Sequence, residues 1–120
     1  MWLYSQSSGR LSRDGALIAV CYSGNGKGLN NPKMQDIHGI GPIPQGLWRI
    51  VRWDDQHGDK GPQVAVLEPD GHDAFGRSAF LVHGDNSEMN HTASHGCIIA
   101  PRHARDQLRA SGEMEIEVTA

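Results

Sequence analysis

The sequence has no long hydrophobic run, few aromatic residues and no excess of basic residues. Its longest uninterrupted apolar stretch is Ala16–Tyr22, far shorter than the ~20 residues that a transmembrane helix needs. Lys and Arg total 11 against 14 Asp and Glu, and the charges are scattered, so the basic patch of a nucleic-acid-binding protein is missing. The first residues also lack the basic start and apolar stretch of a secretory signal peptide. We therefore expect neither a membrane span nor a nucleic-acid partner.

Cysteine is equally scarce. Cys21 and Cys97 are the only two in 120 residues, and they form no CxxC pair or closely spaced cluster. This excludes a small disulfide-rich scaffold and favours two free thiols.

The residues that are abundant predict a small β domain. A chain of 120 residues with 15 Gly and 6 Pro fits one domain, 1–120, of short elements joined by many turns. The breakers concentrate in Ser23–Gly46, which predicts a long functional loop. One helix is expected at Pro101–Ala110. Strands are expected at 1–6, 11–13, 16–22 (buried), 47–53, 64–67, 78–83 and 114–118, and together these predict a mainly-β sandwich or barrel.

Two short segments carry the residues of a nucleophilic site. One is His83-Gly84-Asp85-Asn86, at the end of a predicted strand, and the other is Ser94-His95-Gly96-Cys97. A thiolate is a strong nucleophile, and an imidazole nearby can take the thiol proton. A glycine before the cysteine permits close backbone approach and can present amide N–H groups to an oxyanion. These features predict acyl transfer through a cysteine.

These same residues resemble a known family. Ser94-His95-Gly96-Cys97, preceded by a strand ending in His83-Gly84, is similar to the signature of L,D-transpeptidase catalytic domains. The segments 22–32, 41–46 and 80–85 resemble a compact branch of that superfamily, which includes type VI secretion effectors that attack peptidoglycan. The resemblance runs from about Tyr4 to Val118 and implies an L,D-transpeptidase-like β-sandwich or barrel.

The resemblance also implies roles for individual residues. Cys97 is the expected nucleophile and His83 the general base, with the Gly84 carbonyl orienting the imidazole. The amides of Gly96 and Cys97 are expected in the oxyanion hole, and His95 and Ser94 are expected to shape the turn. Substrate contacts are assigned to Asp85, Asn86 and Arg77, although a solvated charge is an equal alternative for Arg77. No cofactor or metal is expected.

The implied substrate is the tetrapeptide stem of peptidoglycan. Family enzymes cleave after the diamino acid, release the terminal D-alanine, and pass the acyl group to an amine or to water. Cross-linking, D-amino-acid exchange and L,D-carboxypeptidase activity are therefore all expected outcomes. A wall substrate without a signal peptide implies synthesis in the bacterial cytoplasm and export to the periplasm of a target cell, by a secretion machine with a cognate immunity protein. Phage-encoded lysis is the other compatible route.

Two other classes of function remain open from the residues alone. His83, His91, His95 and Cys97 could supply the four ligands of a zinc-dependent hydrolase. A catalytically inactive wall-binding module would keep the fold and lose the reactive thiol.

Overall fold

The structure is a computed structural model that describes residues 1–85 and 94–120. It is built on one nine-stranded sheet and a single α-helix within the described residues, α1 (Arg102–Ser111). No helix in these ranges is long and apolar enough to cross a membrane. The strands are β1 (Trp2–Ser5), β2 (Arg10–Arg13), β3 (Ala16–Val20), β4 (Tyr22–Ser23), β5 (Gly46–Gln56), β6 (Pro62–Asp70), β7 (Phe80–His83), β8 (Ile98–Ile99) and β9 (Glu115–Thr119).

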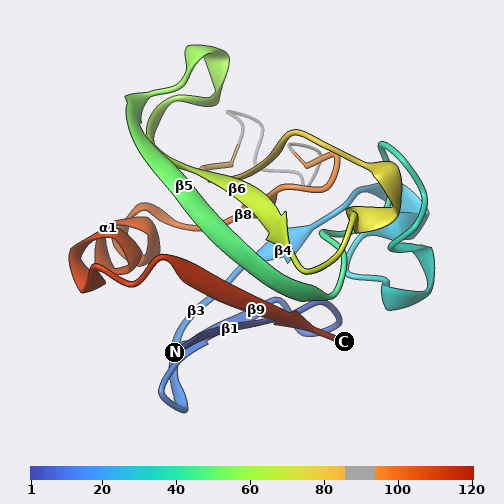
Figure 1. The fold of residues 1–120 in the computed structure, drawn as a ribbon, viewed down its shortest axis with the longest axis horizontal. Coiled ribbons are helices and arrows are strands. Elements are labelled where there is room, and N and C mark those ends of the chain that lie inside the picture. The colour runs from blue at the N-terminus through green and yellow to red at the C-terminus, as the bar shows by residue number, and fades with distance from the viewer. Residues whose placement is uncertain (86–93) are drawn as a thin grey trace.

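The sheet curls into a nearly closed barrel. Its strand order is β3-β2-β1-β9-β5-β6-β7-β8-β4, and the two outermost strands, β3 and β4, are separated in the chain by Cys21 alone. Figure 1 shows β9 lying between β1 and the long strand β5. β1 and β9 run parallel, with Trp2 opposite Ile116, so the first and last strands of the chain are central neighbours.

The main core lies inside this curled sheet. Trp2, Tyr4, Trp48 and Ile116 have no exposed surface and belong to one contiguous apolar cluster. Burial of such large side chains stabilises the fold by about 1.5–3 kcal/mol each. Leu108 of α1 joins the same cluster, which fixes the helix against the sheet.

The helix and the β2–β3 hairpin agree with the sequence prediction. Ala104 and Leu108 share the buried face of α1, and Gly112 ends the helix in the left-handed conformation at φ 72°, as a C-terminal glycine does. Asp14 and Gly15 both have positive φ, which is the turn that an Asp-Gly hairpin requires.

Several strands differ from their predicted extent. Cys21 splits the expected strand 16–22 into β3 and β4, and β3 is not buried, since Leu17 is 52 % and Val20 64 % exposed. Val20 pairs with the exposed Arg10 of β2, so its side chain lies on the solvent-facing side of the sheet. β5 and β6 extend beyond their apolar residues because the ladder continues to the pair of Gln56 and Pro62. The predicted loop 23–46 contains two 3₁₀ helices, η1 (Gly26–Gly28) and η2 (Pro32–Met34).

Candidate active site

His83 and Cys97 come together because β7 and β8 are parallel neighbours. His83 ends β7 and pairs with Ile99 of β8, while Cys97 precedes β8. Side chains two residues apart on a strand share a face, so Cys97 is the diagonal neighbour of His83 on that face. His83 is 2 % exposed and Cys97 9 %. The structure thus places the thiol and the imidazole on one side of the sheet, at diagonal positions of two neighbouring strands.

The hydrogen bonds of His83 define its tautomer. Nδ1 lies 2.7 Å from the Gly84 carbonyl oxygen, which can only accept, so Nδ1 carries the proton and Nε2 the lone pair. Nε2 is buried and has no hydrogen-bond partner among the described residues. Burial lowers the pKa of His83 below 6.5, and the cations of Lys60 and Arg105 act in the same direction. The imidazole is therefore neutral at pH 7, with a proton acceptor available.

The Cys97 thiol is protonated at rest. Its Sγ donates to the Ala79 carbonyl at 3.7 Å, and Ala79 holds a left-handed φ of 66°, which is uncommon outside glycine. Burial raises the pKa of Cys97, while the Leu81 backbone N–H, Lys60 and Arg77 act to lower it. Because a neutral thiol is a poor nucleophile, activation requires a base close by.

Ser94 organises the turn that precedes Cys97. The fully buried Ser94 hydroxyl donates to the Cys97 carbonyl at 2.7 Å and accepts from the amides of Gly24 and Gly96 at 2.9 and 3.1 Å. The Gly96 amide is therefore engaged, which differs from the free oxyanion donor expected from the sequence. Gly96 contributes space instead, because its φ of +136° and its close neighbours leave no room for a Cβ.

Residues of the 23–46 loop support this turn, and sequence reasoning did not assign them. The buried Ser23 hydroxyl donates to the Gly96 carbonyl at 3.0 Å. Asn25 Nδ2 donates to the carbonyls of Ser94 and Gly39, both at 2.8 Å. His95 is exposed, and its Nδ1 lies 3.1 Å from the Gly39 oxygen, which suits the expected shaping role. The signal available in the sequence was small polar residues next to glycines, in Ser23-Gly24-Asn25-Gly26.

Arg77 is buried behind the turn. Its guanidinium donates to four backbone carbonyls, those of Gln35, Pro42, Gly41 and His95, at 2.5 to 3.2 Å. A methyl group at Gly96 would lie 2.6 Å from its Nη2. This location differs from both sequence alternatives, a solvated charge and a substrate contact. Arg77 fastens the 35–42 loop to the turn that carries Cys97.

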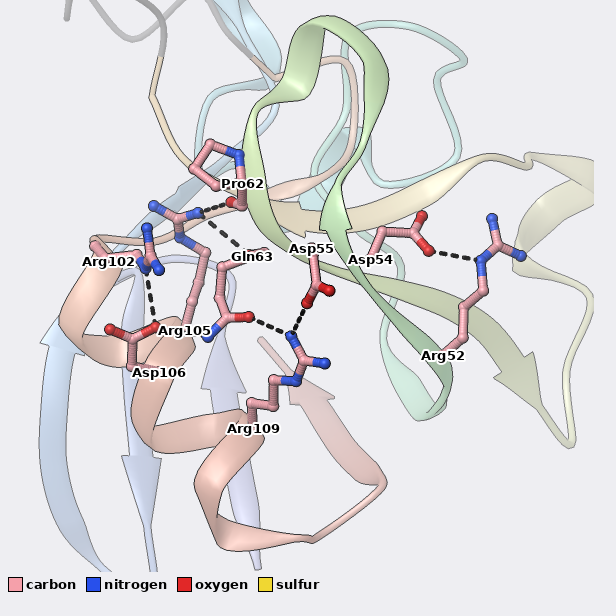
Figure 2. Close-up of polar contacts among 9 residues, drawn as sticks. All are labelled: Arg52, Asp54, Asp55, Pro62, Gln63, Arg102, Arg105, Asp106 and Arg109. Carbon is pink, nitrogen blue, oxygen red and sulfur yellow. Dashed lines mark hydrogen bonds and ion pairs between the residues drawn. The ribbon is translucent and has the colours of Figure 1, made fainter.

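Arg105 has the same relation to the His83-Gly84 segment. Its guanidinium donates to the carbonyls of Ala100, Pro62 and Gln63 at 2.6 to 3.2 Å, two of which Figure 2 shows beside α1. A methyl group at Gly84 would lie 2.9 Å from Arg105 Nη2. Each of the two site glycines, Gly84 and Gly96, therefore packs directly on a buried guanidinium.

The remaining predicted residues are only partly described. Asp85 follows the His83-Gly84 segment and accepts a 2.6 Å hydrogen bond from the Tyr22 hydroxyl. Asn86 and His91 lie outside the described residues. Within 1–85 and 94–120, no three His, Cys, Asp or Glu side chains are grouped to hold a metal ion. Both cysteines are free thiols, as predicted.

Comparison with known proteins identifies the family. A model of the Tlde1 domain matches residues 18–119. The chain belongs to the Tlde1 domain family, a family of type VI effectors. The structure is also similar to the NMR structure of the catalytic domain of an L,D-transpeptidase from E. faecium, with a TM-score of 0.59 and 15 % identity over 98 % of this chain and 95 % of that one. No curated protein matches. The Tlde1 domain therefore has the L,D-transpeptidase fold that the sequence motifs predicted.

Proposed function

We propose that this Tlde1 domain is a cysteine-dependent acyltransferase that acts on the tetrapeptide stems of peptidoglycan. The observation that carries the proposal is the buried, neutral His83, whose Nε2 has no partner among the described residues, on the same face as the Cys97 thiol. Family membership and the L,D-transpeptidase fold support the substrate class. The reaction is attack on the L,D-bond between the third residue of the stem and the terminal D-alanine.

The first half-reaction forms a thioester. His83 Nε2 takes the Cys97 thiol proton as Sγ attacks the carbonyl carbon of the scissile bond. The tetrahedral intermediate collapses with cleavage of the C–N bond, and the imidazolium returns the proton to the departing amine of D-alanine. The Gly84 carbonyl accepts from Nδ1 at 2.7 Å, which holds the ring with Nε2 available and stabilises the imidazolium while it exists.

The second half-reaction releases the acyl group. Water or an amine attacks the thioester carbonyl, His83 removes the proton from the attacking group, and the thiol is regenerated. Water gives L,D-carboxypeptidase activity. An amine from a second stem gives a cross-link, and a free D-amino acid gives exchange. No described residue of the site requires a cofactor for either half.

Membership of a type VI effector family also supports a proposal about location. The domain acts in the periplasm of a target cell after transport from the producing cytoplasm by the secretion machinery. A cognate immunity protein protects the producer from the same reaction.

The proposal is tested with purified protein and tetrapeptide muropeptides, analysed by mass spectrometry. Wild type should release D-alanine and carry the acyl group as a thioester on the peptide containing Cys97, not on the one containing Cys21. Cys97→Ala should lose both signals, and His83→Gln should slow acylation about 10²–10⁴-fold. His103→Ala, an exposed histidine outside the site, is the matched control and should retain the wild-type rate. Stem trimming by Cys97→Ala at the wild-type rate would refute the proposal.

A further inference from the structure

We infer that Arg77 and Arg105 are positioning residues that act by charge: Arg77 stabilises the thiolate of Cys97, and Arg105 holds the imidazole of His83 in its neutral form. The reaction that they serve rests on the proposed function. Their charges can be tested without a substrate.

Arg77 lies behind the turn that carries Cys97. A Cβ added to Gly96, the residue before Cys97, would be 2.6 Å from Arg77 Nη2. Because consecutive Cα atoms are about 3.8 Å apart, the guanidinium lies within about 8 Å of the Cys97 Cα. Burial raises the pKa of Cys97, and the charge of Arg77 acts against that rise. Arg77 is not among the charges that act on His83.

Arg105 has the matching place behind His83. A Cβ added to Gly84, the residue after His83, would be 2.9 Å from Arg105 Nη2, so this guanidinium lies within about 8 Å of the His83 Cα. Burial lowers the pKa of His83, and the charge of Arg105 lowers it further. Arg105 is not among the charges that act on Cys97. Each arginine therefore acts on one member of the pair.

Neither arginine forms an ion pair with any residue that the structure describes. Arg77 donates to four backbone carbonyls and Arg105 to three, two of which Figure 2 draws. Carbonyls hold a guanidinium in place but carry no net charge, so the full positive charge remains. Both side chains are only 7 % exposed, which keeps them away from a substrate and from screening by salt. Such charges are costly to bury, and here they lie beside both reacting residues.

Lys60 differs from the two arginines because it does not distinguish the thiol from the imidazole. It lies in η3 (Gly58–Lys60), at the tip of the β5–β6 hairpin, and its charge acts on both Cys97 and His83. It therefore shifts the two groups together. The other ionisable neighbours are His57 and Asp85 around His83, Asp36 near Arg77, and Arg102 and Asp106 near Arg105.

The two charges assist successive proton transfers. When His83 Nε2 takes the thiol proton, Arg77 stabilises the Cys97 thiolate that remains. The imidazolium that forms beside Arg105 is a stronger acid, so it returns the proton more readily to the departing amine. The proton that leaves Sγ is the one that reaches the amine, and no further reactant is needed.

The thiolate half is tested by alkylation of the folded protein with iodoacetamide across a pH range, with mass spectrometry of the peptide that contains Cys97. Arg77→Gln keeps amide donors but loses the charge, and it should raise the midpoint of alkylation by about 0.5–1 pH unit. Arg77→Lys keeps the charge but loses the planar fork, and its midpoint should stay within about 0.3 pH unit of wild type. Equal rises in the two variants would mean that Arg77 only supports the turn, and would overturn the inference.

The imidazole half is tested by NMR titration of His83. Arg105→Gln should raise the titration midpoint of His83 by about 0.5–1 pH unit, and Arg105→Lys should leave it near the wild-type value. The two Gln variants are matched controls for each other. Arg77→Gln should leave the His83 titration unchanged, and Arg105→Gln should leave the alkylation of Cys97 unchanged. A shift of both groups in either variant would contradict the inference.

Urea unfolding checks that each variant is folded, and two substitutions outside the buried arginines keep the test decisive if those variants do not fold. Asp36 is exposed and its charge opposes that of Arg77, so Asp36→Asn should lower the alkylation midpoint of Cys97. Asp106 has the same relation to Arg105, so Asp106→Asn should lower the titration midpoint of His83. An unchanged or raised midpoint would count against the corresponding arginine.

The outcomes also separate this inference from the proposed function. If tetrapeptides yield no thioester while the midpoints shift as described, the proposed function fails and the assignment of the two charges stands. If the thioester forms but the midpoints do not shift, the charge assignment is wrong and the acyltransferase stands.

Discussion

In the proposed mechanism, the protonation of His83 sets the pH range in which the site works. Its pKa is lowered below 6.5, chiefly by burial, so the imidazole stays a base at pH values where a solvated histidine is already half protonated. We predict that the acidic limb of the pH–rate profile for thioester formation has its midpoint below 6.5. Assays of thioester formation from pH 5 to 8 with tetrapeptide muropeptides measure it. A midpoint at or above 6.5 would show that another group controls activation.

Gly96 is a position where a single methyl group should be costly. Its φ is +136°, and an added Cβ would lie 2.6 Å from Arg77 Nη2 and 2.9 Å from Phe80 Cε1. We predict that Gly96→Ala lowers the free energy of unfolding by about 3 kcal/mol, combining backbone strain with a steric clash, and abolishes acylation of Cys97.

Gly71→Ala separates these two effects. Gly71 has φ +82° with open space around it, so the same substitution there should cost only the backbone strain, about 1–2 kcal/mol. Urea unfolding of both variants gives the comparison. If the two variants lose equal free energy of unfolding, the contact with Arg77 does not add to the cost of Gly96→Ala.

The sequence predicted which residues meet at the site but not what surrounds them. Cys97, His83 and the two glycines were identified because short segments of adjacent residues contain the groups that this chemistry needs. For Gly84 the sequence suggested a carbonyl that orients His83, and that hydrogen bond is present. For Gly96 it suggested close approach by a substrate. The structure adds a reason that the sequence did not suggest, because guanidinium groups from Arg105 and Arg77 pack against the two glycines. Such contacts depend on strand order, which no local pattern reveals.

Helix α1 contacts the sheet through one buried arginine, which also packs against Gly84, and one exposed arginine. Arg105 is 7 % exposed and donates to three carbonyls beneath Gly84. Arg109 lies on the surface and contacts Asp55 and Gln63 at 2.9 and 2.6 Å (Figure 2), where Asp55 is 91 % exposed. The two contacts should differ widely in energy, because only removal of the first leaves a buried carbonyl, that of Ala100, without this partner.

We therefore predict that Arg105→Met destabilises the protein by about 3 kcal/mol, whereas Arg109→Met costs less than about 1 kcal/mol. Arg105→Met should also slow acylation, because Gly84 loses its support and the His83 ring loses its fixed position. Chemical denaturation together with the acylation rate measures both effects. A similar stability loss in the two variants would contradict the distinction.

Elements with strong local signals were predicted well. The helix at 101–110 followed from proline, an apolar stripe and glycine, and the hairpin at Asp14-Gly15 from its turn. β8 was missed because two residues, Ile98 and Ile99, carry no periodicity. It exists because β7 and β4 lie on either side of it, and both partners come from distant parts of the chain.

Buried ionisable groups make the whole protein sensitive to alkali. Burial raises the pKa of Cys21 from 9.0 to about 12, and it also raises the pKa values of Cys97 and Tyr4. In the unfolded chain these groups ionise near their ordinary values, so unfolding releases protons at high pH. The stability they contribute is present below pH 9 and is lost as pH rises above it.

We predict that the free energy of unfolding falls steadily between pH 9 and 11. Urea titrations under reducing conditions measure this slope. Cys21→Val removes one of the buried ionisable groups and should make the slope shallower. An unchanged slope in that variant would mean that Cys21 is accessible to hydroxide in the folded state.

The central place of β9 has a consequence for the order of events during synthesis. The sheet is divided into β3-β2-β1 on one side and β5-β6-β7-β8-β4 on the other, and β9 alone joins the two by hydrogen bonds. Its pairing with β1 links Trp2 to Ile116, nearly the full length of the chain apart. Contacts this remote form late and slowly. The barrel cannot close until residue 119 has left the ribosome, so the core that positions Cys97 and His83 is completed only after that point.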